Sequence, residues 1–171
     1  CKHDLSRSFP ESVQEAASKL PKKLLKADLK NRLDLRHSLT LGIIGNNNDS
    51  KVIENAFTLE KTSAGNWRLG FHIADICQHI QPDEALDREA LKRGRSVYLG
   101  ELVLSMLPEV VAERCALLPG SDRLALSFLI TVDSKSGQVL EWEIQPSVVK
   151  VDVSLSEQQT EAILSNQSSD H

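Results

Sequence analysis

Apolar and polar residues alternate most clearly between residues 67 and 73. Four apolar side chains fall there on one face of a predicted strand: Trp67, Leu69, Phe71 and Ile73. The preceding stretch AFTLEK is also rich in strand-forming residues, and the turn sequence TSAG stands between the two. Together they predict a β-hairpin. A second pair of such stretches flanks DSKSG and predicts another hairpin between residues 124 and 155.

Three other stretches have the spacing or the terminal residues of helices. Near the start, a helical pattern precedes Pro21, which breaks helices: Val13, Ala16, Ala17 and Leu20. In the middle of the chain, Pro82 and Asp83 favour a helix start and Gly94 favours its end. Towards the end, Ser156 is a helix N-cap residue and acidic Glu157 follows it. The pattern predicts an α+β fold, mainly antiparallel strands with flanking helices.

Charge is distributed unevenly, although the net charge of the 171 residues is only −4. Lysine and arginine are concentrated between residues 19 and 36, whereas neither follows Lys150. The basic stretch is either a solvated helix face or an arm that contacts phosphates, and both interpretations stay open.

The cysteines and the hydropathy of the chain bear on its compartment. Three cysteines are widely spaced and form no C-x-x-C motif: Cys1, Cys77 and Cys115. This usage is typical of a reducing compartment in which thiols are buried as small apolar groups, so we predict an intracellular protein, cytoplasmic or nuclear. No apolar run approaches membrane-spanning length, so no membrane partner is predicted.

Most familiar catalytic motifs are missing from the sequence. There is no G-x-S-x-G elbow and no P-loop, and the histidines lack the spacing of metal ligands. The one tyrosine, Tyr98, follows RGRSV and so stands close to Arg93 and Arg95. An aromatic ring beside guanidinium groups suits a nucleobase and its phosphate. The alternative is a tyrosine that belongs to the core.

Five stretches, in this order along the chain, resemble the motifs of one family: GNWRLGFHIADI, ALDREALKRGRSVYL, MLPE, LLPGSDRLALS and PSVVK. The resemblance is to the catalytic RNB domain of the ribonuclease II family and covers about residues 25–165. We therefore expect a lead-in over residues 1–24, the N-terminal portion of an RNB domain over 25–165 and a polar tail over 166–171. Two of the motifs look closest to the RNB segment of vertebrate helicase-with-zinc-finger coactivators. We accordingly expect the chain to belong to a larger multidomain protein.

The resemblance implies a 3′-to-5′ exoribonuclease that degrades single-stranded RNA to nucleoside monophosphates with Mg²⁺ held by aspartates. The family's metal loop reads T-I-D and then D-x-D-D-A. Counting back from GFHIAD without a gap, Glu54 and Asn55 take the paired aspartate positions, Val52 the third and Asn46 the first. Asparagine offers an uncharged oxygen and valine offers none, so most of the charge that Mg²⁺ requires is missing. Glu54 and Asp49 remain the candidate metal ligands.

These observations predict an RNA-binding, exoribonuclease-like domain with a degenerate Mg²⁺ loop, catalytically weak or inactive. Its degenerate catalytic positions are Asn46, Glu54 and Asn55. Its predicted RNA contacts are Tyr98, Arg93 and Arg95. One alternative is an active Mg²⁺-dependent exoribonuclease with unexpected ligands such as Asp49, Glu54 and Asp75. Another is a protein-interaction module of a transcriptional coactivator.

Overall fold

The computed structural model describes residues 6–44, 53, 55–100 and 102–167. The chain forms two compact units, and each unit combines two separate parts of the sequence. The first unit consists of residues 1–23 and 76–114, and the second consists of residues 24–75 and 115–171. The chain therefore leaves the second unit after Asp75 and returns to it at Cys115.

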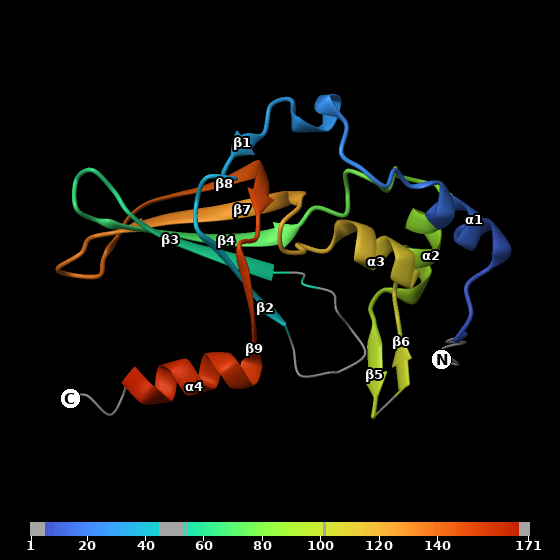
Figure 1. The fold of residues 1–171 in the computed structure, drawn as a ribbon. Coiled ribbons are helices and arrows are strands. Elements are labelled where there is room, and N and C mark those ends of the chain that lie inside the picture. The colour runs from blue at the N-terminus through green and yellow to red at the C-terminus, as the bar shows by residue number, and fades with distance from the viewer. Residues whose placement is uncertain (1–5, 45–52, 54, 101, 168–171) are drawn as a thin grey trace. The chain divides into compact units, whose positions relative to one another are not determined.

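Among its described residues, the second unit contains a seven-stranded sheet with the strand order β1-β8-β7-β4-β3-β2-β9 (Figure 1). The strands are β1 (Leu33–Asp34), β2 (Thr40–Ile44), β3 (Asn55–Lys61), β4 (Trp67–Ala74), β7 (Asp122–Val132), β8 (Val139–Lys150) and β9 (Val153–Ser156). Neighbouring strands are antiparallel except at the two edges, where β1 lies parallel to β8 and β9 lies parallel to β2. A short 3₁₀ helix η1 (Lys26–Leu29) precedes β1, and helix α4 (Glu157–Gln167) follows β9.

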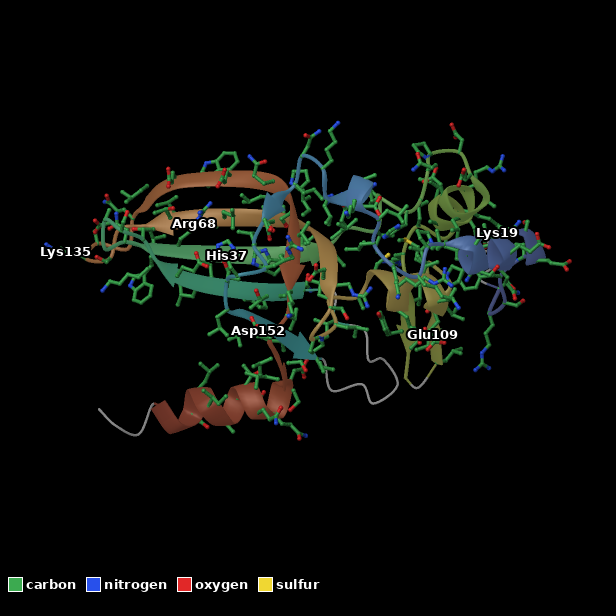
Figure 2. The ribbon with its side chains drawn as sticks, turned by 45° about the horizontal axis from the view of Figure 1, so that its top comes forward. Lys19, His37, Arg68, Glu109, Lys135 and Asp152 are labelled. Atoms are coloured by element: carbon green, nitrogen blue, oxygen red, sulfur yellow. The ribbon has the colours of Figure 1, made fainter. Side chains whose placement is uncertain are left out.

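Both hairpins predicted from the sequence are confirmed, as β3–β4 and β7–β8. The second hairpin ends at Lys150, earlier than predicted, because the residues after it form the separate strand β9, which pairs with β2. The two hairpin turns contain Gly65 and Gly137 at φ 84° and 71°, a conformation that glycine adopts at no steric cost. In the second turn, the Asp133 carboxylate accepts hydrogen bonds from the backbone N–H groups of Ser136 (2.7 Å) and Lys135 (3.0 Å). Figure 2 labels Lys135 at this end of the hairpin. Local turn chemistry thus suffices to define both hairpins.

The core of the second unit lies against one face of this sheet. Its buried apolar members are Leu35, Ile53, Ala56, Leu117, Ala125, Leu129, Val149 and Val151. The predicted apolar row of β4 occupies the opposite face, where Trp67 and Leu69 are 39% and 40% exposed, while Gly70 and His72 between them are buried. Exposed apolar side chains continue along this face on β3 and β8, with Leu59 next to Leu69 and Trp142 in the same cross-strand row. The alternation therefore locates the strand correctly, but the more apolar face is the more open one.

The first unit contains the helices α1 (Glu11–Lys19), α2 (Ala85–Arg93) and α3 (Glu109–Cys115), and the hairpin of β5 (Val97–Leu99) and β6 (Leu102–Leu104) (Figure 1). Helix α1 ends before Pro21 as predicted, and the Arg114 guanidinium donates to the carbonyls of Ala17 (3.2 Å), Ser18 (3.3 Å) and Leu20 at its end. A cation at the last carbonyls of a helix is a favourable cap.

The predicted helix ends are partly confirmed. Gly94 ends α2 in the left-handed conformation, at φ 71°. The start of α2 lies at Ala85, after the predicted Pro82–Asp83, because Asp83 itself takes φ 65° and its N–H donates to the Asp87 carboxylate at 2.9 Å. Before α4, the Ser156 hydroxyl accepts from the Gln159 N–H (3.1 Å) while the Gln159 side chain accepts from the Ser156 N–H (2.9 Å). This is the reciprocal capping box that the sequence S-x-x-Q permits.

Cys77 and Cys115 are the two cysteines among the described residues. Cys115 is buried as expected, whereas Cys77 is exposed, so burial of the thiols holds for only one of these two. Within the described ranges, no helix is both long enough and apolar enough to span a bilayer.

Candidate functional site

The predicted catalytic loop is described only at its end. Asn46, Asp49, Val52 and Glu54 lie outside the described residues. Asn55 is the first residue of β3, where it pairs with Ile73 of β4, and it is exposed to solvent. Its amide is therefore accessible at the end of the β3–β4 hairpin where β4 leads into Asp75.

The Asp75 carboxylate, which follows β4, is held by a buried arginine. The Arg32 Nη2 lies 2.6 Å from Asp75 Oδ2, and the two side chains are 7% and 18% exposed. Arg32 also donates to the carbonyls of Ser147 and Ala125 at 3.4 and 3.5 Å. To bind a metal, Asp75 would have to give up its ion pair with this buried guanidinium, which is costly. Across the described parts of the chain, no group of three His, Cys, Asp or Glu side chains could hold a metal ion.

A chain of buried polar groups crosses the core face of the sheet. His72 on β4 bonds through Nε2 to the Thr58 hydroxyl on β3 (3.1 Å) and through Nδ1 to the Ser127 hydroxyl on β7 (2.7 Å). The Ser127 hydroxyl in turn meets that of Ser147 on β8 at 2.5 Å, and the Ser147 hydroxyl donates to the Ala125 carbonyl at 3.2 Å. Four neighbouring strands are thus connected by side chains as well as by their backbones, and each side chain of this row has a hydrogen-bond partner.

Burial sets the protonation state of His72. The ring is fully buried, and loss of hydration lowers its pKa from 6.5 to about 4, although the negative charge of Glu60 raises it slightly. The imidazole is therefore neutral at physiological pH. One ring nitrogen donates and the other accepts, which suits a row of hydroxyl groups on both sides.

Gly70 provides the space that this buried row requires. A methyl group at its Cα would overlap the Thr58 hydroxyl and come within 2.8 Å of His72 Cε1. We expect Gly70→Ala to lower the free energy of unfolding by about 1–3 kcal/mol, as overpacking of a core does. Urea unfolding followed by tryptophan fluorescence measures this loss.

A double variant tests whether Gly70→Ala loses stability through steric overlap with Thr58 or through the lost flexibility of the strand backbone. Adding Thr58→Ala removes the oxygen that the new methyl group meets, so part of the stability should return relative to the sum of the two single changes. Strictly additive effects of the two substitutions would contradict the steric explanation.

In the first unit, Tyr98 lies on the exposed β5–β6 hairpin. Its side chain is 64% exposed and stands opposite Val103, which is 43% exposed. Arg95 precedes the hairpin and is also exposed, and within the described residues its guanidinium has neither a hydrogen bond nor an ion pair. In this chain the Tyr98 ring is accessible, and it lies close in sequence to the exposed guanidinium of Arg95.

Arg93 is placed differently from Arg95, because its side chain is only 6% exposed. Its guanidinium donates to Glu89 (2.8 Å), to the Ser105 carbonyl (3.1 Å) and to the Ser8 carbonyl (2.9 Å), and it lies 3.8 Å from the centre of the Phe9 ring. It thus connects α2, the end of the hairpin and the segment before α1. The structure brings Arg93 and Tyr98 into one unit, but it gives the Arg93 side chain intramolecular partners. Its predicted contact with RNA stays a prediction.

Comparison with known proteins identifies the family. A sequence model of the RNB domain matches residues 32–171. The chain belongs to the RNB domain family. Its relatives include a ribonuclease R of Thermotoga maritima, 41% identical over 87% of this chain and 21% of that protein. The acetazolamide resistance protein zam of Synechocystis is likewise 41% identical, over 89% of this chain and 20% of that protein. The chain thus spans about a fifth of the length of these relatives.

Solved structures of RNB-family proteins have the same fold. Mycoplasma genitalium RNase R in complex with double-stranded RNA superposes with a TM-score of 0.85 at 23% identity, over 96% of this chain and 29% of that one. Yeast Ssd1, described as a pseudonuclease, superposes with a TM-score of 0.82, also at 23% identity, over 95% of this chain and 20% of that one. The α+β fold and the RNB resemblance read from the sequence are confirmed, while the likeness to coactivator segments stays a prediction.

RNB-family ribonucleases generally depend on Mg²⁺. Of the positions that carry aspartates in the family's pattern, the chain retains one carboxylate, Glu54. Asn55 contributes only an amide, and Asp75 is engaged by Arg32. Hard divalent cations require anionic oxygen ligands, and Glu54 is the carboxylate that the sequence offers at these positions.

Two sets of long-range contacts, one within each unit, were not predicted from the sequence. The buried pair of Arg32 and Asp75 is separated by 43 residues, and the Arg93 contacts reach back 85 residues to Ser8. The motif NRLDLR contains Arg32, but only the pairing of β1 with β8 carries it to the end of β4. No local pattern in the sequence marks either set of partners.

Proposed function

We propose that this chain is the RNA-binding part of an RNB domain that no longer hydrolyses RNA by the family's metal chemistry. The observation that carries the proposal is the loss of charge before β3, where Asn46, Val52, Glu54 and Asn55 stand at the family's aspartate positions. Divalent cations near one another repel unless several carboxylates neutralise them. A single carboxylate, Glu54, is insufficient for that role.

The surroundings of Asp75 support this proposal. Asp75 follows β4 at the hairpin end where β3 begins, so it is a described carboxylate near the loop that could replace a lost ligand. Arg32 neutralises it instead. The fold alone is compatible with either outcome, because it occurs both in a ribonuclease R and in a protein described as a pseudonuclease.

We expect the full-length protein to show no Mg²⁺-dependent hydrolysis of RNA at this site. The measurement is single-turnover decay of end-labelled single-stranded RNA in Mg²⁺ or Mn²⁺. Replacing Asn46, Val52, Glu54 and Asn55 together by aspartate should restore metal binding, which calorimetry measures independently of cleavage. Release of monophosphates by the unmutated protein, abolished by Glu54→Gln, would show that the loop is active.

A gel shift with single-stranded RNA, with and without EDTA, distinguishes three functions: RNA binding without metal chemistry, Mg²⁺-dependent exoribonuclease activity, and protein interaction without RNA. Binding that does not depend on metal supports the proposal. Cleavage that EDTA stops supports the active exoribonuclease. Absence of binding supports a protein-interaction module instead.

Tyr98 should contribute to RNA affinity by base stacking. Stacking of a base on an aromatic side chain is worth about 1–3 kcal/mol, so Tyr98→Ala should raise the Kd for single-stranded RNA about five-fold or more. Fluorescence anisotropy with labelled RNA at low salt measures this change. Tyr98→Phe keeps the ring and should bind normally, and Leu91→Ala, at a 72% exposed position of α2, is the matched surface control. An unchanged Kd for Tyr98→Ala would mean that the ring does not meet RNA.

A further inference from the structure

A hollow of about 500 Å³ lies in the first unit, and Val103 of the β5–β6 hairpin is one of the residues that line it. Its walls come from the segment before α1, from α1, from β6 and from the start of α3, and they include Arg7, Phe9, Gln14, Val103 and Glu109. Opposite residues of an antiparallel pair point to the same face, so Tyr98 stands on the face from which Val103 reaches the hollow.

The segment that carries Arg7 is fixed in place by contacts of its neighbours. Arg93 donates to the Ser8 carbonyl at 2.9 Å and stacks on the Phe9 ring, and the Gln14 side chain donates to the Phe9 carbonyl at 2.8 Å. Arg93 itself is anchored by Glu89 and is almost completely buried. These contacts hold the backbone next to Arg7, while the Arg7 side chain is exposed and forms neither a hydrogen bond nor an ion pair with any described residue.

Two side chains of opposite charge line the hollow. Arg7 has an exposed guanidinium with no partner among the described residues, and a guanidinium binds phosphate oxygens well. Glu109, labelled in Figure 2, is an exposed carboxylate at the start of α3. A phosphate is attracted by Arg7 and repelled by Glu109, so it should bind at the Arg7 side. The remaining wall combines apolar side chains with Ser8, Ser105 and the amide of Gln14, whose Nε2 donates to the Phe9 carbonyl. A base likewise has an apolar face and polar edges.

We propose that this hollow is a nucleotide subsite: it takes the nucleotide next to the one stacked on Tyr98, with its phosphate on Arg7. The inference rests on the proposed RNA-binding function and adds a second, adjacent contact to it. Arg93 then acts as a positioning residue, because it holds the Arg7-bearing segment and the end of the hairpin in one arrangement without needing to meet RNA itself.

The test is the salt dependence of single-stranded RNA binding by the full-length protein, with labelled oligouridine as the probe. Loss of one phosphate contact lowers the slope of log K against log salt by about 0.7 for single strands. Arg7→Ala should show this decrease, and Arg7→Lys should keep the slope of the unmutated protein. Glu109→Gln should bind more tightly, because a repulsive charge is removed. Arg88→Ala, an exposed arginine of α2 outside the hollow, is the matched control and should leave the slope nearly unchanged.

Crosslinking locates the contact independently of affinity. Thiouridine-substituted RNA should crosslink to the peptides that contain Phe9 or Val103, and less so after Arg7→Ala. If Tyr98→Ala weakens binding while Arg7→Ala has the slope of Arg88→Ala and no crosslink reaches these peptides, the subsite is overturned and the proposed function stands. If the unmutated protein does not bind RNA, the proposed function fails and the subsite fails with it.

Discussion

Replacing Asp75 by alanine is expected to lower the free energy of unfolding by about 3–5 kcal/mol, because removing one partner of a buried ion pair leaves the other charge buried and uncompensated. The guanidinium of Arg32, 7% exposed, would lose a carboxylate 2.6 Å away and would be too buried for water to replace that partner fully. Urea unfolding followed by circular dichroism and tryptophan fluorescence measures the loss.

Two further variants make the Asp75 prediction specific. Asp34→Ala removes an aspartate that also pairs with an arginine, Arg36, but at the surface, with 54% and 38% of the side chains exposed. Its effect should be much smaller, because water screens exposed pairs. The double variant Arg32→Met with Asp75→Leu removes both charges and should recover much of the loss. Equal losses for Asp75→Ala and Asp34→Ala would mean that burial of the Arg32 pair contributes little.

Acidification from pH 7 to pH 4 is expected to destabilise the second unit by up to about 3 kcal/mol through His72 alone. Burial lowers the pKa of His72 from 6.5 to about 4, so between these values the unfolded chain binds a proton that the folded chain does not. The stabilising contribution is therefore complete above about pH 6.5 and falls as the pH drops towards 4. The pKa of Asp34 is also lowered, by its bonds with Arg36, but a lowered carboxyl pKa acts at a more acidic pH.

Unfolding by urea at a series of pH values measures this dependence. His72→Gln removes the titrating ring, so the variant should be less stable at pH 7 but should lose little more between pH 6.5 and 4. His37→Gln, at an exposed histidine, is the matched control and should keep the dependence of the unmutated protein. If the free energy of unfolding of His72→Gln still fell as steeply between pH 6.5 and 4, the pH dependence would belong to another group.

The elements that the sequence predicted well are those whose signals are local. Alternation around Trp67 and the turn sequences TSAG and DSKSG define β3–β4 and β7–β8, because a hairpin needs only its own two strands and its turn. Gly94 and Ser156 mark helix ends for the same reason, since a cap satisfies backbone groups within one turn. The order of motifs also indicated the RNB family.

The sequence by itself determined the family, the fold class and the loss of charge before β3, because a missing carboxylate is missing in any conformation. Only the tertiary structure decided the surroundings of Asp75, His72 and Tyr98. It pairs Asp75 with Arg32, buries His72 against Ser127 of another strand, and places Tyr98 on an open hairpin. These partners meet because strands distant in sequence pair side by side and because the chain returns to each unit after leaving it. Such long-range pairing is fixed by burial of the whole core, and no short stretch of sequence contains that information.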